Sequence, residues 1–199
     1  MTLSLAIHNS KNIVLISDSM GIETLYDGTE IIHNDTKKIY KINSYSAFSI
    51  AGNFDTNMVF RVLEELLKRL KYQKLCIDQI FEYSFIFLGR NLLYLDPDDK
   101  LEVIFAGYTE DGVPKLITLM KNNGKINRYQ PMSEFYDMIG FKKPQLLAKD
   151  IMEQRGVNLD SKSSLLKRAS LEIMRKSIQM YPGMTGGKPR MVMLKKPRI

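Results

Sequence analysis

The chain has 199 residues, 44% of them hydrophobic and 26% charged, which is ordinary for a globular domain and long enough for one sizeable core. No apolar run approaches the ~20 residues of a membrane span, and no charged segment followed by an apolar one marks a secretion signal. The single cysteine, Cys76, excludes an internal disulfide and favours a reducing, cytoplasmic location. The formal net charge is +7, but Lys and Arg are mixed with acids and no recognition motif is present, which argues against a nucleic-acid partner.

The first third of the chain contains two predicted strand pairs. Residues 2–8 and 12–17 are short apolar runs around a polar turn, and they predict a β-hairpin. Residues 18–36 are polar and predict an irregular loop. Residues 37–42 and 46–51 predict a second pair of strands.

Two helices and a further set of strands follow. Apolar residues recur at helical spacing over 54–70 and 77–95. The segments 101–108, 113–120 and 125–132 then predict an antiparallel meander, because turn sequences such as Asp-Gly and Asn-Gly separate them.

The last part of the chain repeats this order. Helices are predicted over 144–155 and 161–180, and a final strand over 190–194. Strands clustered apart from helices indicate an α+β class and not a doubly wound α/β sheet. We expect a single domain over 1–199, with two stacked, mainly antiparallel sheets and a helix pair on each outer face.

The usual catalytic motifs are absent from the sequence. The two histidines, His8 and His33, have no metal-ligand spacing and no cysteine or carboxylate cluster joins them. No nucleophile elbow, phosphate-binding loop or dinucleotide fingerprint is present. We therefore expect neither a metal nor a cofactor.

Thr2 draws attention because the ordered pattern starts directly behind Met1. Removal of Met1 would leave a free α-amine on Thr2, next to the hydroxyl of the same residue. An α-amine has a pKa of about 7.7–8.0, so much of it is neutral near neutral pH. One residue then holds both a nucleophile and its base.

Three further residues suit this chemistry. Lys38 is a cation that would lower the pKa of the amine, and Asp18 is a carboxylate that would hold Lys38 in place. The backbone at Gly52, after a predicted strand, is a candidate oxyanion donor. Lys37 is adjacent to Lys38, and a shift of one residue reverses the face of a strand, so only one of the two lysines is expected to point toward Thr2.

These residues resemble those of proteasome β-type subunits, and especially of the shorter HslV-like peptidases among the N-terminal nucleophile (Ntn) hydrolases. The resemblance rests on Thr2 with its strand, on Ile13–Asp18 followed by Ser19, on Thr36–Ile42, on Ser49-Ile50-Ala51-Gly52 and on the segment IFAGYTEDGVPKLITL. The order of elements matches over essentially the whole chain.

The resemblance implies a four-layer αββα sandwich and a threonine-dependent peptidase or amidase. Thr2 would be the nucleophile, Lys38 the tuning cation, Asp18 its partner and Gly52 an oxyanion donor. It also implies a ring-forming homo-oligomer that acts on peptides or unfolded proteins, with a companion ATPase unfoldase as a partner. The apolar side chains Phe81, Phe85, Phe87 and Leu88 were a second reason to expect assembly.

The sequence departs from the family pattern in two supporting segments. Phe141 stands where the family has a serine, and Pro182 where it has an aspartate, although Thr185 is a substitute for a later serine. These losses keep a second interpretation open, a catalytically silent member that serves assembly or binding. A third is an unrelated basic binding protein, in which Asp18 is a turn residue, Lys38 an exposed strand lysine and Gly52 a strand–helix junction.

Overall fold

The computed structural model describes residues 3–25, 27–54, 56–93, 96–129 and 131–197. Eleven strands and four helices are assigned within these residues. In chain order they are β1 (Leu3–His8), β2 (Asn12–Ser17), β3 (Gly21–Thr24), β4 (Glu30–His33), β5 (Ile39–Lys41), β6 (Ala47–Asn53), α1 (Thr56–Lys71), α2 (Ile77–Asn91), β7 (Lys100–Tyr108), β8 (Pro114–Asn122), β9 (Lys125–Tyr129), β10 (Tyr136–Gly140), α3 (Lys142–Gln154), α4 (Ser163–Met180) and β11 (Arg190–Lys195).

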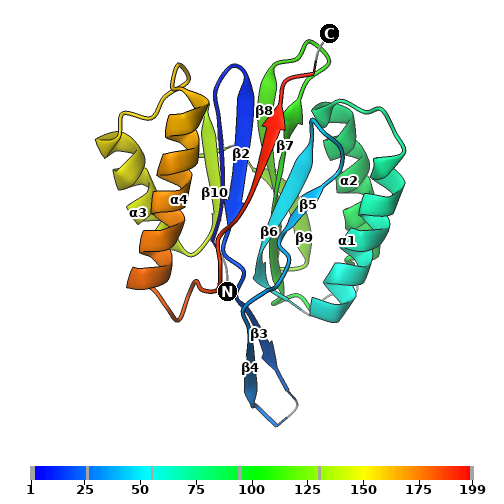
Figure 1. Ribbon diagram of the computed structural model, residues 1–199. Coiled ribbons are helices and arrows are strands. Elements are labelled where there is room, and N and C mark those ends of the chain that lie inside the picture. Colours follow the sequence, from blue (N-terminus) through cyan, green and yellow to red (C-terminus); the bar gives the residue numbers. More distant parts are fainter. Residues whose placement is uncertain (1–2, 26, 55, 94–95, 130, 198–199) are drawn as a thin grey trace.

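Two antiparallel sheets stack face to face between two helix pairs (Figure 1). One sheet has the strand order β10-β1-β2-β11, and the other has the order β5-β6-β7-β8-β9. Helices α3 and α4 cover the outer face of the first sheet, and α1 and α2 cover the second. This arrangement confirms the predicted α+β class and the four layers αββα.

Strand alternation divides the core into three layers. Successive side chains of a strand point to opposite faces, so Leu3, Leu5 and Ile7 of β1 pack toward α3 and α4. Ala6 of the same strand packs between the two sheets, together with Ile104 of β7. The third layer joins the five-stranded sheet to α1 and α2. Each sheet is therefore apolar on both faces, which explains why its strands are nearly continuous apolar runs.

The four predicted helices are present, with ends that differ from the predicted ones by a few residues. The largest difference is at the end of α2, which stops at Asn91 and not at 95. Pro144 lies in the first turn of α3, where a residue without an N–H group costs no helical hydrogen bond. The spacing of apolar residues was sufficient to predict the helices because each helix buries one stripe of side chains against a sheet.

Two strand predictions were incomplete. The segment 18–36 was expected to be irregular, but it contains the hairpin β3–β4. The strand β10 was not predicted, because it is short and the buried acid Asp137 interrupts its apolar pattern. β10 pairs with β1 along five residue pairs, from Leu3 opposite Gly140 to Ile7 opposite Tyr136, and so borders the N-terminal strand.

The aromatic residues of α2 have a different role from the one expected. Phe81 and Leu88 are buried in the core between α1, α2 and the five-stranded sheet, and Phe85 and Phe87 pack against that core. These side chains stabilise the fold of the single chain, so they no longer count as a reason to expect assembly.

Candidate functional site

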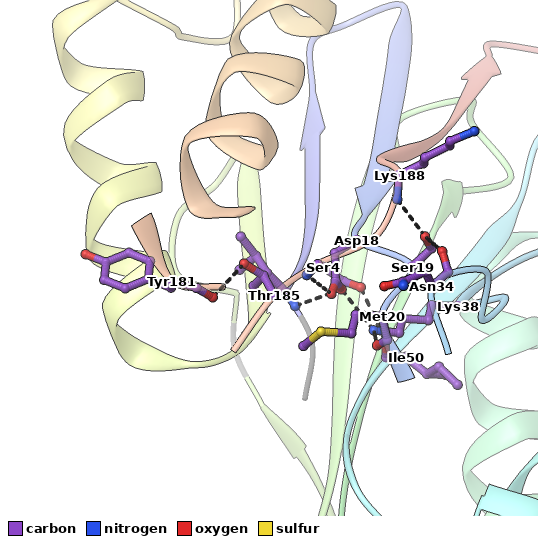
Figure 2. A network of polar contacts seen from close by, with 12 residues as sticks. Ser4, Asp18, Ser19, Met20, Asn34, Lys38, Ile50, Tyr181, Thr185 and Lys188 are labelled. Carbon is purple, nitrogen blue, oxygen red and sulfur yellow. Dashed lines mark hydrogen bonds and ion pairs between the residues drawn. The ribbon is translucent and has the colours of Figure 1, made fainter. Parts of the chain in front are cut away.

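A buried ion pair joins Asp18 and Lys38 at the end of the sandwich where the N-terminal strand begins. The Lys38 Nζ donates a hydrogen bond of 3.0 Å to Asp18 Oδ1 and another to the Met20 carbonyl oxygen. Asp18 is fully buried and Lys38 is 4% exposed. Figure 2 shows the two side chains pointing toward one another. The predicted contact between Asp18 and Lys38 is confirmed.

The backbone holds the Asp18 carboxylate from both sides. The Leu3 N–H donates to Oδ1 at 3.2 Å, and the Gly186 N–H donates to Oδ2 at 3.1 Å. Asp18 follows β2, Leu3 begins β1 and Gly186 lies in the segment before β11, so three neighbouring strands of one sheet meet at this carboxylate. These two backbone hydrogen bonds fix the carboxylate relative to the start of β1, in addition to its contact with Lys38.

Burial changes the acid–base properties of both members of the pair. Loss of solvent raises the pKa of Asp18, and the Lys38 charge and the hydrogen bonds from Lys38, Gly186 and Leu3 offset part of this increase. Loss of solvent lowers the pKa of Lys38, and Asp18 offsets part of that decrease. Burial thus disfavours the charged forms of both groups, and each member of the pair favours the charged form of the other.

Lys37 lies on the other side of the chain, as predicted. It is exposed, and its Nζ lies 4.8 Å from the centre of the Tyr40 ring. The register in which Lys38 faces Asp18 is therefore the one that the structure adopts, and the alternative with Lys37 at the site is excluded.

Gly52 borders a cavity of about 110 Å³ next to Lys38. The cavity lies between the β3–β4 hairpin, the end of β6 and the start of α1; its lining includes Met20, Thr24, Glu30, Ala51 and Phe60. Gly52 has a φ of +143°, and a Cβ atom there would overlap the carbonyl oxygen of Lys100. Only glycine fits this position, which is the penultimate residue of β6 and lies close to the predicted junction with the helix.

Thr2, the predicted nucleophile, lies outside the described residues. The nearest described residue is Leu3, whose amide is bonded to Asp18. Within the described part of the chain, no group of three or more His, Cys, Asp and Glu residues is placed to hold a metal ion. Among the helices described, none combines the length and the apolarity needed to cross a membrane.

The segment of residues 181–188 forms part of the site, and its contacts with residues 18–20 were not predicted from the sequence. Thr185 is buried, and its hydroxyl donates to the Tyr181 carbonyl oxygen at 3.4 Å, while Pro182 is exposed. The Ser19 hydroxyl accepts from the Lys188 N–H at 2.9 Å and donates to the Asn34 carbonyl oxygen at 2.6 Å (Figure 2). This network fastens residues 18–20 to the segment that bonds Asp18. The sequence pointed to this segment through the family likeness at Pro182 and Thr185, and it did not predict the network.

Two carboxylates, the half-buried Glu102 and the buried Asp137, were not predicted. Glu102 of β7 accepts a hydrogen bond of 2.6 Å from the Gly140 N–H, and Gly140 is paired with Leu3. Asp137 of β10 accepts from the Thr118 hydroxyl and from the Met138 N–H. Each acid accepts a hydrogen bond from the opposite sheet. Phe141, which follows Gly140, precedes α3 and supplies no hydroxyl there.

Comparison with known proteins identifies the fold. No protein family model matches the sequence, and no curated protein matches it. Among solved structures, an Anbu (Gly-1) mutant from Hyphomicrobium sp. strain MC1 matches with a TM-score of 0.71 at 13% identity, over 98% of this chain and 83% of that one. The fold is the proteasome-like Ntn-hydrolase fold.

Two other structures support this assignment. Anbu (ancestral beta-subunit) from Yersinia bercovieri has a TM-score of 0.69 at 14% identity, over 97% of this chain and 81% of that one. Eukaryotic HslV from Trypanosoma brucei has a TM-score of 0.63 at 16% identity, over 97% of this chain and 99% of that one. At these identities, the Ntn-hydrolase likeness is one of fold.

Proposed function

We propose that this protein is an N-terminal threonine hydrolase that cleaves amide bonds in peptides or unfolded proteins, with Thr2 as the nucleophile. The observation that carries the proposal is the buried Asp18–Lys38 pair, bonded to the amide of the residue that follows Thr2. A buried ion pair costs desolvation energy and is weak evidence for stability alone. Its position at the start of β1 supports a role in chemistry.

The amide that directly follows Thr2 in the chain lies close to Lys38. Leu3 N and Lys38 Nζ share Asp18 Oδ1 as an acceptor, at 3.2 and 3.0 Å, so the two nitrogens are at most about 6 Å apart. Thr2 directly precedes Leu3 in the sequence. The proposed nucleophile is therefore the residue next to an amide that shares an acceptor with the proposed cation.

The proposed reaction uses groups of this chain only. After Met1 is removed, the Thr2 α-amine accepts the proton of the Thr2 hydroxyl while the oxygen attacks the carbonyl carbon of the substrate. The Lys38 charge favours the neutral amine and the developing alkoxide, and Asp18 holds Lys38. The backbone N–H at Gly52 donates to the oxyanion. The amine then gives its proton to the leaving nitrogen, and water hydrolyses the acyl-enzyme.

The proposal extends to the assembly of the protein and its partners. We infer a single domain over residues 1–199 that forms a ring-shaped homo-oligomer in the cytoplasm, as the likeness to HslV and Anbu suggests. We expect the cavity beside Lys38 and Gly52 to receive a side chain of the peptide substrate. An ATPase unfoldase is the partner expected of such a ring.

A second candidate function is a catalytically silent subunit with a role in assembly or binding. Phe141 and Pro182 favour it, because both stand where the family has polar residues that support the amine. Loss of such support misaligns a reacting group, and a shift of 1 Å costs about 10²-fold in rate.

An adduct experiment tests the proposal. Intact mass establishes whether Met1 is absent, and an electrophile that captures an N-terminal threonine is then added. We expect a single adduct on Thr2, none with Thr2→Ala, and turnover of small peptides that Thr2→Ser retains in part. Absence of an adduct on protein shown to lack Met1 would replace the hydrolase by the silent subunit.

A further inference from the structure

The β3–β4 hairpin projects from the sandwich beside the N-terminal end of β1 (Figure 1). Its two strands have four residues each and pair with each other, from Gly21 opposite His33 to Thr24 opposite Glu30. They form a separate two-stranded sheet. We call residues 21–33 the arm.

The arm exposes large apolar side chains to solvent in the single chain. Leu25 is 40% exposed, Ile31 is 39% exposed and Ile32 is 59% exposed. Ile31 and Ile32 are consecutive in β4, so they lie on opposite faces of the ribbon. A two-stranded hairpin is at best marginally stable in water by itself. Both faces of the arm would therefore gain stability from a surface that covers them.

The arm also differs in charge from the rest of the chain. It contains Glu23, Asp27 and Glu30 and no Lys or Arg. Its single histidine, His33, lies 3.0 Å from Glu23 through Nε2. The whole chain has a net charge of +7, so the residues outside the arm carry a formal charge of +10. The surface that best complements an acidic and apolar arm is thus the basic body of the same protein.

We propose that the arm docks on a basic surface of a second copy of this chain. Electrostatic complementarity selects the partner and its orientation, and the exposed Leu25, Ile31 and Ile32 provide the apolar contact. The arm and the basic surface are different patches, so the contact is heterologous and repeats from copy to copy, as a ring requires. The inference rests on the ring assembly proposed above and names the segment that makes it.

Charge reversal on the arm tests this contact. Glu23→Lys combined with Glu30→Lys places cations against a basic surface, and we expect the concentration for half-assembly to rise about tenfold or more in light scattering and sedimentation. The matched control is Glu110→Lys with Asp111→Lys, on the exposed turn between β7 and β8, which should assemble like the wild type. Because the contact is electrostatic, wild-type assembly should weaken at high salt.

Cross-linking of the unaltered protein tests the same contact without a variant that must fold. Copies labelled with ¹⁴N and ¹⁵N are mixed, and a carbodiimide joins carboxylates to lysines at zero length. We expect mixed-isotope peptides that link Glu23, Asp27 or Glu30 of one copy to a lysine of another. Assembly that the arm variant leaves unchanged, without such peptides, would overturn the arm as the contact.

The outcomes separate this inference from the hydrolase proposal. A wild-type protein that is monomeric at all concentrations tested would overturn both the ring and the arm contact. The adduct on Thr2 is measured independently and would still decide the chemistry. A Thr2-negative protein that assembles through the arm would support the inference and leave a silent subunit as the function.

Discussion

The protein buries two lysines in two different ways. Lys38 is 4% exposed and donates to a carboxylate, Asp18 Oδ1, as well as to a carbonyl oxygen. Lys121 of β8 is 2% exposed and donates to two carbonyl oxygens, those of Asp96 and Asp99, at 2.7 and 3.1 Å. Carbonyl dipoles satisfy the donors of an ammonium group, but only a carboxylate couples its charge to that of a second titratable group.

The two lysines also differ in what lies next to them. Lys38 borders the cavity that Gly52 lines, and it is close to the start of β1. Lys121 ties the segment between α2 and β7 to β8 of the five-stranded sheet. Burial alone therefore does not indicate function. An acidic partner together with an adjacent cavity is the combination that distinguishes Lys38.

The largest expected difference between the two lysines is in catalysis. Lys38→Ala removes the cation that favours the reactive form of Thr2, and kcat for a small peptide should fall by about 10²–10³ or more. Lys121→Ala should leave kcat per folded molecule within a few-fold of the wild type. Turnover normalised to the fraction of folded protein checks this, and an equal loss in both variants would remove the distinction.

The second difference is in stability. Asp18→Asn leaves the Lys38 ammonium buried without a counter-charge, and the free energy of unfolding should fall by about 3–5 kcal/mol. Asp18→Asn combined with Lys38→Met should recover much of this loss, because no buried charge remains. Lys121→Met should cost less, about 1–3 kcal/mol, because two carbonyls lose a donor. Urea unfolding measures all three, and additive effects of Asp18→Asn and Lys38→Met would contradict a coupled pair.

The segment that bonds Asp18 gives a smaller effect. Gly187 has a φ of +69°, and a Cβ atom there would overlap the Ser19 hydroxyl. Gly187→Ala should therefore destabilise by about 1–3 kcal/mol and also lower activity, since Ser19 adjoins Asp18. Gly28→Ala is the control, because Gly28 has a similar φ of +82° and open space around it. A Gly28 variant as inactive as the Gly187 variant would show that backbone strain alone was responsible.

The smallest effect concerns the half-buried Glu102, which has no cation bonded to it among the described residues. Burial raises the pKa of Glu102, which the Gly140 hydrogen bond offsets in part. Its folded-state pKa lies above the unfolded value, so its contribution to stability is full below about pH 4.3 and is lost as pH rises through the folded pKa.

This sign gives the prediction for Glu102→Gln. The amide stays neutral, so the wild type should gain stability relative to the variant as pH falls from neutral toward 5, by at most about 1.4 kcal/mol per pH unit. Thermal unfolding of both proteins across this range measures the difference. A difference that shrinks in favour of the variant at low pH would mean that the folded state prefers the charged form.

Much of the fold was predictable because it depends on local periodicity. The helical spacing of Val59, Leu63, Leu66 and Leu70 identified α1, and all four residues are buried. The pairing of the first two strands followed from their apolar runs and the short turn. β10 was missed because its buried Asp137 accepts a hydrogen bond from Thr118 of the other sheet, a partner that no local sequence pattern reveals.

The candidate site was predictable in part. The contact of Asp18 with Lys38, and the outward direction of Lys37, agreed with expectation. The role of Gly186 as a donor to Asp18 was not foreseen, because 168 positions separate the two residues. Resemblance to a family supplied the register, and spacing alone would have left Lys37 and Lys38 equivalent.

The sequence by itself determined which apolar side chains of the predicted strands and helices share a face, because alternation and helical spacing follow from backbone geometry. It also determined the charge contrast between the arm and the body of the chain. Only the tertiary structure decided which buried groups meet. Asp18 lies beyond the end of β2 in one sheet and Lys38 before β5 in the other, and a face that is known to be buried does not specify what covers it. The packing of the two sheets brings these charges together and leaves the arm outside.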